Sequence, residues 1–154
     1  MGRLRSPLFH ISRKYMPVSF RILNTHGLVY VRYEGVATMD ETMSVFADYA
    51  QHPDCHPGLK QLVDLSRITD IAFDFPKLME MQARKADVFM SGAAETLMVY
   101  LAQTPKAIAV ANAVLRSWEP FPWVVPVVVE DESEALSILG LRERSLSELL
   151  VAAR

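Results

Sequence analysis

The feature that most constrains the fold is the alternation of strand-like and helix-like apolar patterns along the chain. Two strand patterns come first, at 18–23 ("VSFRIL") and 28–35 ("LVYVRYEG"), and the turn sequence "NTHG" separates them. So short a turn predicts an antiparallel hairpin. Later apolar runs of strand length predict three more strands, at 61–65, 96–102 and 123–130.

Helix-start signals lie between these strands. Thr38 and Glu41 fit a capping box, and the helix that they begin should end before "HPDCHPG". Asp74 is a candidate N-cap ahead of Pro76, and Thr104 precedes Pro105 in the same way. The last helices are predicted from Asp131 to Gly140 and after Ser145, where Ser145 and Glu148 fit another capping box.

The predicted order is β-β-α-β-α-β-α-β-α, which indicates one α/β domain with a mostly parallel five-stranded sheet and one antiparallel hairpin strand. A length of 154 residues suits a single domain. Pro126 lies inside the last predicted strand and lacks an amide donor, so that strand should be at an edge or carry a bulge.

Charge and cysteine content narrow the function classes. The net charge is −2, which gives no general attraction to nucleic acid, and no apolar run reaches the ~18 residues of a membrane span. The single cysteine, Cys55, excludes an intramolecular disulfide and favours a cytoplasmic setting.

The first 16 residues contain four basic side chains and no acidic one. They lack the apolar core of a signal peptide, so we expect a basic arm or an upstream extension, with Met16 as an alternative start. The folded domain is predicted to span 17–154. The basic residues are Arg3, Arg5, Arg13 and Lys14.

Three segments carry a resemblance to a known family: "GLVYVRYEGVATMDE", "HPDCHPGLKQLVDLSRIT" and "VVVEDESEALSILG". Together with the element order, they resemble the STAS domain, and most closely the SpoIIAA-like or STAS/SEC14-like bacterial proteins. The likeness covers about 17–140. It implies a SpoIIAA-like fold and, since catalytic and nucleotide-binding motifs are missing, a regulatory or protein-interaction role; we expect no cofactor.

The stretch "LVDLSRITDIAFDFP" (62–76) reads as a strand that ends in a polar turn. In the anti-sigma-factor antagonists that it resembles, a phosphorylated serine stands at the following helix start. Ala72, Phe73 and Asp74 occupy that region here, so the resemblance implies that the phosphoserine switch is absent. The turn still supplies the partner-binding candidates Asp64, Ser66, Arg67, Thr69, Asp70 and Asp74. Each of these residues also has a purely structural alternative. Asp74 could cap the next helix, and the hydroxyls of Ser66 and Thr69 could bond turn amides. Asp64 could accept hydrogen bonds from the turn amides or pair with Arg67.

The loop "HPDCHPG" contains four metal-ligand types: His52, Asp54, Cys55 and His56. Their spacing fits no zinc motif, so we expect a solvated loop whose cysteine fills an apolar gap, with no metal. A hydrolase using Cys55 or Asp64 is a further alternative, although the nucleophile-elbow, dinucleotide and P-loop motifs are missing.

Methionine and aromatic residues in the second half of the chain predict either an ordinary hydrophobic core or an exposed apolar surface that contacts a ligand or partner. The candidates for a hydrophobic ligand site or a homodimer face are Met79, Met98, Trp118, Phe121 and Trp123. The first functional hypothesis is thus a non-enzymatic module that binds a protein partner, with a carrier of a small hydrophobic molecule as the alternative. A carrier should have an apolar cavity of ~300–1,000 Å³.

Overall fold

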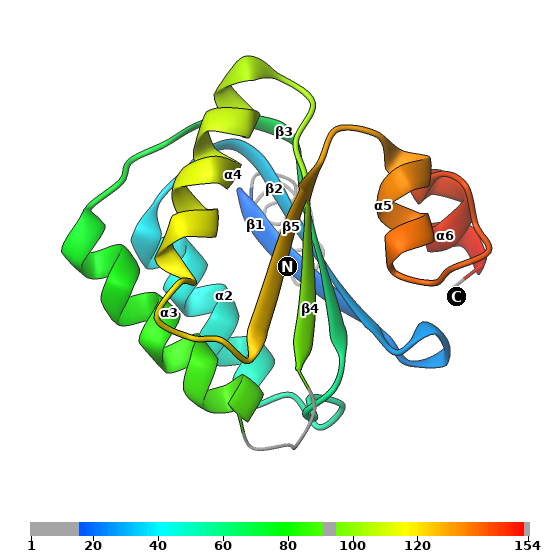
Figure 1. Cartoon of the computed structure of the whole chain (residues 1–154), viewed down its shortest axis with the longest axis horizontal. Helices are drawn as coiled ribbons and strands as arrows, with labels where there is room; N and C mark the ends of the chain where they lie inside the picture. Colours follow the sequence, from blue (N-terminus) through cyan, green and yellow to red (C-terminus); the bar gives the residue numbers. More distant parts are fainter. Residues whose placement is uncertain (1–15, 91–94, 153–154) are drawn as a thin grey trace, which may run out of the picture.

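In the computed structural model, which describes residues 16–90 and 95–152, a five-stranded sheet lies between two layers of helices (Figure 1). The strands are β1 (Val18–Leu23), β2 (Leu28–Ala37), β3 (Lys60–Ile71), β4 (Thr96–Leu101) and β5 (Val124–Val129). The helices are α2 (Met39–Ala50), α3 (Phe75–Met90), α4 (Pro105–Ser117), α5 (Glu132–Ile138) and α6 (Leu146–Ala152), and a short 3-10 turn, η1 (Asn24–His26), joins β1 to β2.

The strand order in the sheet is β1-β2-β3-β4-β5. β1 and β2 are antiparallel, and the other neighbours are parallel. This topology confirms the predicted mixed sheet. Pro126 lies in β5, at the edge of the sheet, where the missing amide costs no ladder hydrogen bond on the open side.

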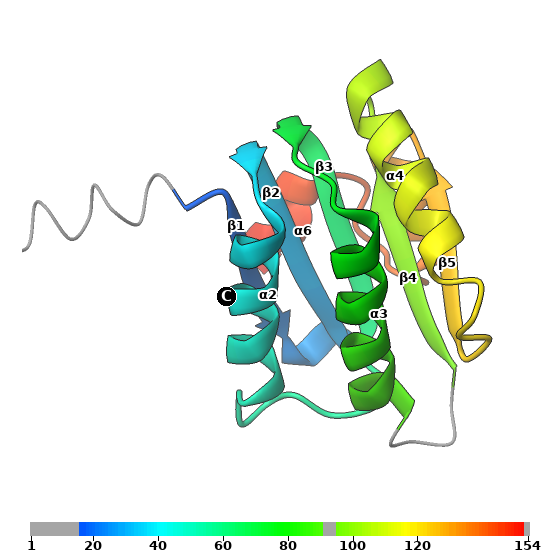
Figure 2. The same cartoon turned by 90° about the vertical axis from the view of Figure 1, so that its left-hand side faces the viewer.

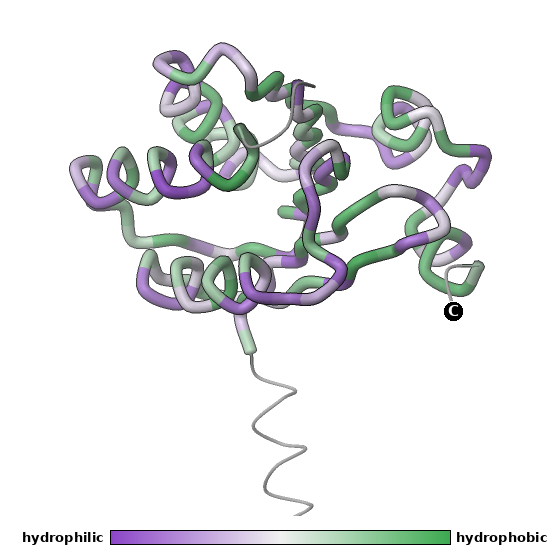
Figure 3. Tube along the Cα trace, turned by 90° about the horizontal axis from the view of Figure 1, so that it is seen from below, coloured by the Kyte–Doolittle hydropathy of each residue, from purple (hydrophilic) through white to green (hydrophobic). Residues whose placement is uncertain are grey.

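Each face of the sheet has its own core. α2, α3 and α4 lie side by side over one face, and α5 and α6 cover the other (Figures 1 and 2). The first core includes Trp118, Met98 and Phe89, and the second is rich in leucine, including Leu62 and Leu136. Figure 3 shows the apolar strands inside and polar residues recurring along the turns of the helices.

The predicted helix starts are confirmed by their hydrogen bonds. Thr38 Oγ1 accepts from the Glu41 amide at 3.1 Å, and Glu41 Oε1 accepts from the Thr38 amide at 2.8 Å, which completes a capping box. The side chains of Thr104 and Asp131 likewise accept hydrogen bonds from backbone amides in the first turns of α4 and α5. Asp74 Oδ1 accepts from the Lys77 amide at 3.2 Å at the start of α3.

One expectation about the elements is wrong. β3 does not end at residue 65 in a polar turn but continues to Ile71, because Ile68 and Ile71 are buried beneath the helices while the polar residues between them face outward. Residues 67–71 also remain paired with the end of β2. The chain ends in two short helices, α5 and α6, which agree with the helices predicted after Asp131 and after Ser145.

The predicted basic arm lies outside the described residues, apart from Met16.

Candidate functional site

Exposed apolar side chains gather where β2 and β3 end. Val36 is 65% exposed near the end of β2, Phe73 is 41% exposed in the following loop, and Phe75 is 61% exposed at the start of α3. The Ala72 amide donates to the Ala37 carbonyl at 3.4 Å, which holds the loop beside the end of β2. Figure 2 shows the strand ends and the first turns of α2 and α3 at the same end of the molecule.

We call this region the carboxyl-edge surface and define it by Val36, Arg67, Thr69, Asp70, Phe73 and Phe75. Arg67, Thr69 and Asp70 are exposed positions of the β3 extension. Asp70 accepts from its neighbour's amide (Ile71, 2.8 Å) and lies 3.4 Å from Lys106 Nζ. The amide hydrogen bond, followed by Lys106, holds the pKa of the Asp70 carboxyl below its usual range.

Asp64 and Ser66, two other predicted partner contacts, have their polar groups engaged inside the domain. Asp64 is buried, and its Oδ2 accepts from the Tyr30 hydroxyl at 2.5 Å. Its Oδ1 accepts from the Ser66 amide at 3.0 Å and from Ser66 Oγ at 2.6 Å. Burial and this hydrogen bond raise the pKa of the Tyr30 phenol. The local alternative predicted for Asp64, in which it accepts from following amides, is therefore the geometry observed.

The four ligand-type residues of the "HPDCHPG" loop point to separate partners. His52 Nδ1 accepts from the Asp54 amide, the Asp54 carboxylate accepts from Asn24, and His56 contacts the carbonyl of Pro57. Within 16–90 and 95–152, no group of three or more His, Cys, Asp or Glu side chains comes together in a way that could hold a metal ion. Cys55 is half-buried and packs against the core under the helices.

The three predicted aromatic contacts form part of the core. Trp118 is 1% exposed and donates from Nε1 to the Tyr100 hydroxyl at 2.8 Å, so the expectation that it contributes to an exposed dimer face is wrong. Phe121 packs between Trp118 and Trp123, with ring centroids 6.1 and 5.8 Å away. Trp123 is half-buried and donates to the Ala86 carbonyl at 3.0 Å.

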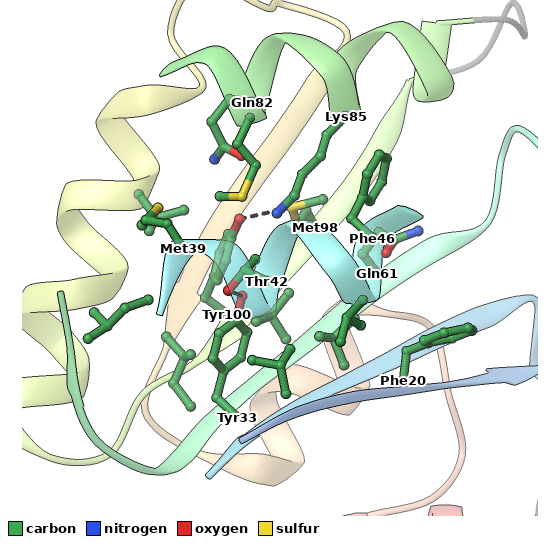
Figure 4. A pocket seen from close by; sticks show the side chains of 18 of the residues that line it. Phe20, Tyr33, Met39, Thr42, Phe46, Gln61, Gln82, Lys85, Met98 and Tyr100 are labelled. Atoms are coloured by element: carbon green, nitrogen blue, oxygen red, sulfur yellow. Dashed lines mark hydrogen bonds between the residues drawn. The ribbon is translucent and has the colours of Figure 1, made fainter. Parts of the chain in front are cut away.

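An apolar cavity of about 80 Å³, here called the α2–α3 cavity, lies between α2, α3 and the sheet (Figure 4). Met98 lines it, as predicted for the hydrophobic ligand site, whereas Met79 lies half-buried on α3 and is not among the lining residues. Phe73 also lines the cavity and is partly exposed, so the cavity reaches the surface beside the carboxyl-edge surface.

Lys85 is the unexpected residue of this cavity. Figure 4 shows its side chain extending from α3 into the region lined by Met98 and Tyr100, where the Tyr100 hydroxyl donates to Met98 Sδ at 2.9 Å. Its Nζ lies 5.8 Å from the centroid of the Phe46 ring, and burial lowers the pKa of the amine to about 8. Sequence analysis missed Lys85, although it lies four residues before Phe89 and seven after Leu78, on the apolar stripe of the helix.

Gln82, one turn before Lys85, is also buried against the cavity. Its Nε2 donates to Ser117 Oγ at 2.9 Å. Its Oε1 is buried and accepts no hydrogen bond from the described part of the chain. A buried acceptor left in this state costs about 1–3 kcal/mol, so the position favours a bound donor such as water or a ligand hydroxyl.

A second hollow, of about 560 Å³, lies between η1 and the α5–α6 connection. His26 Nε2 lies 3.3 Å from Glu143 Oε2 at its wall. Lys60, Arg142, Glu143 and Glu148 line this hollow, so its two positive and two negative charges balance and give it no preference for an anion or a cation.

Comparison with known proteins supports the fold. No protein-family model and no curated protein matches the chain. A solved structure from Shewanella loihica PV-4, described as an uncharacterized protein of the DUF3478 family with a SpoIIAA-like fold, is similar at a TM-score of 0.50 and 15% identity. The match covers 73% of this chain and 83% of that chain. The chain thus forms an α/β domain of SpoIIAA-like fold, as the resemblance implied. None of the helices in the described ranges is both long and apolar enough to cross a membrane.

Proposed function

We propose that the chain is a non-enzymatic regulatory module that binds a protein partner through the carboxyl-edge surface. The observation that carries the proposal is the exposure of Val36, Phe73 and Phe75 at one end of the sheet. Exposed apolar side chains that cluster, rather than scatter singly, mark interaction sites in soluble proteins. The SpoIIAA-like fold is consistent with a module that acts through binding.

Charged residues around these apolar side chains support the same proposal. Arg67 and Asp70 project from the β3 extension, and Lys106 lies beside Asp70. An apolar centre with a charged rim is the usual composition of a protein–protein interface. We further propose that binding here does not depend on a phosphoserine, since Ala72, Phe73 and Asp74 supply no hydroxyl in the loop before α3.

The test compares proteins captured from a cell lysate by the wild type, by a Val36→Ser/Phe75→Ser variant and by Arg67→Glu. Ile138→Ser is the matched control, because Ile138 is 40% exposed but lies on α5, on the opposite side of the sheet. A captured protein is then purified and its affinity is measured. We expect at least ~10-fold weaker binding for both surface variants and wild-type affinity for the control.

Equal affinity of all four proteins for the purified partner would contradict the proposed surface. Analytical ultracentrifugation of the purified chain tests whether the partner at this surface is a second copy of the chain. A dimer of the wild type that is lost in the Val36→Ser/Phe75→Ser variant would show that it is.

A small apolar ligand is the second candidate, and the α2–α3 cavity favours it. Its volume of about 80 Å³ is well below the ~300 Å³ expected of a lipid carrier, so a lipid-like molecule would require α2 and α3 to move apart. Native mass spectrometry against a denatured control tests this candidate: excess mass of several hundred daltons that is lost on denaturation would support a lipid carrier, and its absence would argue against one.

A further inference from the structure

We propose that the α2–α3 cavity is a binding site for a small aliphatic monocarboxylic acid, whose carboxylate pairs with the Lys85 amine and whose apolar body lies beneath α2 and α3. The proposal is independent of the carboxyl-edge surface as a protein-binding site. It goes beyond an unspecified hydrophobic ligand because it assigns the head group, the size and the residue that recognises it.

The position of Lys85 is the first argument. Its side chain comes from the inward stripe of α3 and lines the cavity, with Nζ 5.8 Å from the centroid of the Phe46 ring (Figure 4). Lys85 takes part in none of the five ion pairs between described residues. A charged amine in apolar surroundings without a carboxylate is costly, and an incoming carboxylate would supply the missing counter-charge.

The composition and size of the cavity indicate that the part of the ligand beyond its carboxylate is apolar and small. Valine, methionine and aromatic side chains make up most of its wall, including Val31, Met81 and Met98. A cavity volume of about 80 Å³ is far below the ~300 Å³ of a typical ligand pocket and limits the ligand to a very small molecule, such as butyrate. A phosphate would need several donors, whereas Lys85 is the cationic residue that lines this cavity.

Gln82 provides a second, independent observation. Its buried Oε1 lacks a donor among the described residues and lies on the same helix face as Lys85, one turn away. A water retained next to the carboxylate, or a hydroxyl on the ligand, would satisfy this oxygen. Since buried polar groups in folded proteins nearly always have a partner, this oxygen indicates that the cavity accepts a polar group.

Lys85 is also the group that titrates in the cavity near neutral pH. The other titratable lining residues are Tyr33, Tyr49 and Tyr100, and burial raises the pKa of all three phenols, which keeps them neutral. Since the free amine loses its proton near pH 8, the affinity for a carboxylate should fall about 30-fold between about pH 7 and about pH 9.5.

The experiment is calorimetric titration of the full chain with butyrate, and with butyramide as the neutral molecule of the same shape. We expect butyrate to bind at least ~10-fold more tightly than butyramide, and Lys85→Met to weaken butyrate binding by at least ~10-fold. Lys77→Met is the control, because Lys77 lies on the same helix but is exposed and paired with Asp40 at 3.0 Å. It should bind butyrate as the wild type does.

A second measurement remains informative if Lys85→Met does not fold. Nuclear magnetic resonance of the lysine ε-methylene groups in the wild type should show one resonance whose pKa rises when butyrate is added. Equal binding of butyrate and butyramide, unchanged binding in a folded Lys85→Met variant, or no heat and no change in any lysine pKa at ~10 mM butyrate would each overturn the proposal. The Val36→Ser/Phe75→Ser variant should still bind butyrate, because neither residue lines the cavity.

Discussion

Replacing Lys85 with methionine should stabilise the folded chain near neutral pH. In the fold, burial lowers the pKa of this amine from the ordinary value of 10.5 to about 8, so the unfolded chain holds the proton more tightly than the folded chain does. A difference of this size corresponds to about 3 kcal/mol of lost stability at a pH below both values. Since the side chain is only half-buried, solvent screening reduces the expected gain to about 1–3 kcal/mol.

The same difference gives the wild type a characteristic pH dependence. Between about pH 8 and about pH 10.5, the unfolded chain binds more protons at this site than the folded chain, so the free energy of unfolding rises with pH. The rise from about pH 7 to about pH 9.5 amounts to about 2 kcal/mol before screening. Lys85→Met removes the titrating group and should abolish this contribution.

Urea unfolding followed by tryptophan fluorescence provides the assay, at about pH 7 and about pH 9.5, for the wild type, Lys85→Met and Lys77→Met. The pH is kept below 10, because the buried tyrosines ionise more readily in the unfolded chain and would destabilise the fold above that value. The same pH dependence for the wild type and Lys85→Met, or a loss of stability at neutral pH in Lys85→Met, would refute the reasoning that the amine is buried at a cost.

Three further substitutions test individual contacts by the change in the free energy of unfolding, measured by urea titration. Thr38→Ala removes the capping box shared with Glu41 and should cost about 1 kcal/mol, and unchanged stability would argue against the cap. Tyr30→Phe removes the hydroxyl that donates to buried Asp64 and should cost about 1–3 kcal/mol, with a value near zero showing that the carboxylate finds another donor. Trp118→Ala should cost about 3–5 kcal/mol, and a loss below about 1 kcal/mol would show that Trp118 is not packed in the core.

The order of elements could be predicted because local signals mark it. Period-two alternation identifies β1 and β2, and hydroxyl or carboxylate caps mark the starts of α2, α4 and α5. The end of β3 could not be predicted, because the polar side chains of "SRITD" also suit a turn. Pairing with the end of β2 and burial of Ile68 and Ile71 decide in favour of the strand, and both depend on tertiary structure.

The exposed part of the candidate site was predictable from the polar character of "SRITD", although these residues continue a strand and do not form a turn. Arg67 and Asp70 are exposed, as a contact surface requires, whereas buried Asp64 accepts hydrogen bonds inside the domain. Lys85 was missed because lysines on helices usually face solvent or extend their amines to it. Only the packing of α2 and α3 over the sheet shows that this amine faces a cavity.

The long β3 strand accounts for both proposed sites. It pairs with β4 only from Gln61 to Asp64 but follows β2 as far as Ile71. In this extension, inward residues such as Ile68 line the α2–α3 cavity, and the outward residues Arg67, Thr69 and Asp70 contribute the polar part of the carboxyl-edge surface. Phe73, just beyond the extension, lines the cavity and is also exposed at that surface. Any ligand that moves Phe73 would change the affinity for a partner, and by thermodynamic reciprocity the partner would change the affinity for the ligand by the same factor. A substitution at Phe73 would alter both sites at once, so the variants that separate the two proposals have to leave it unchanged.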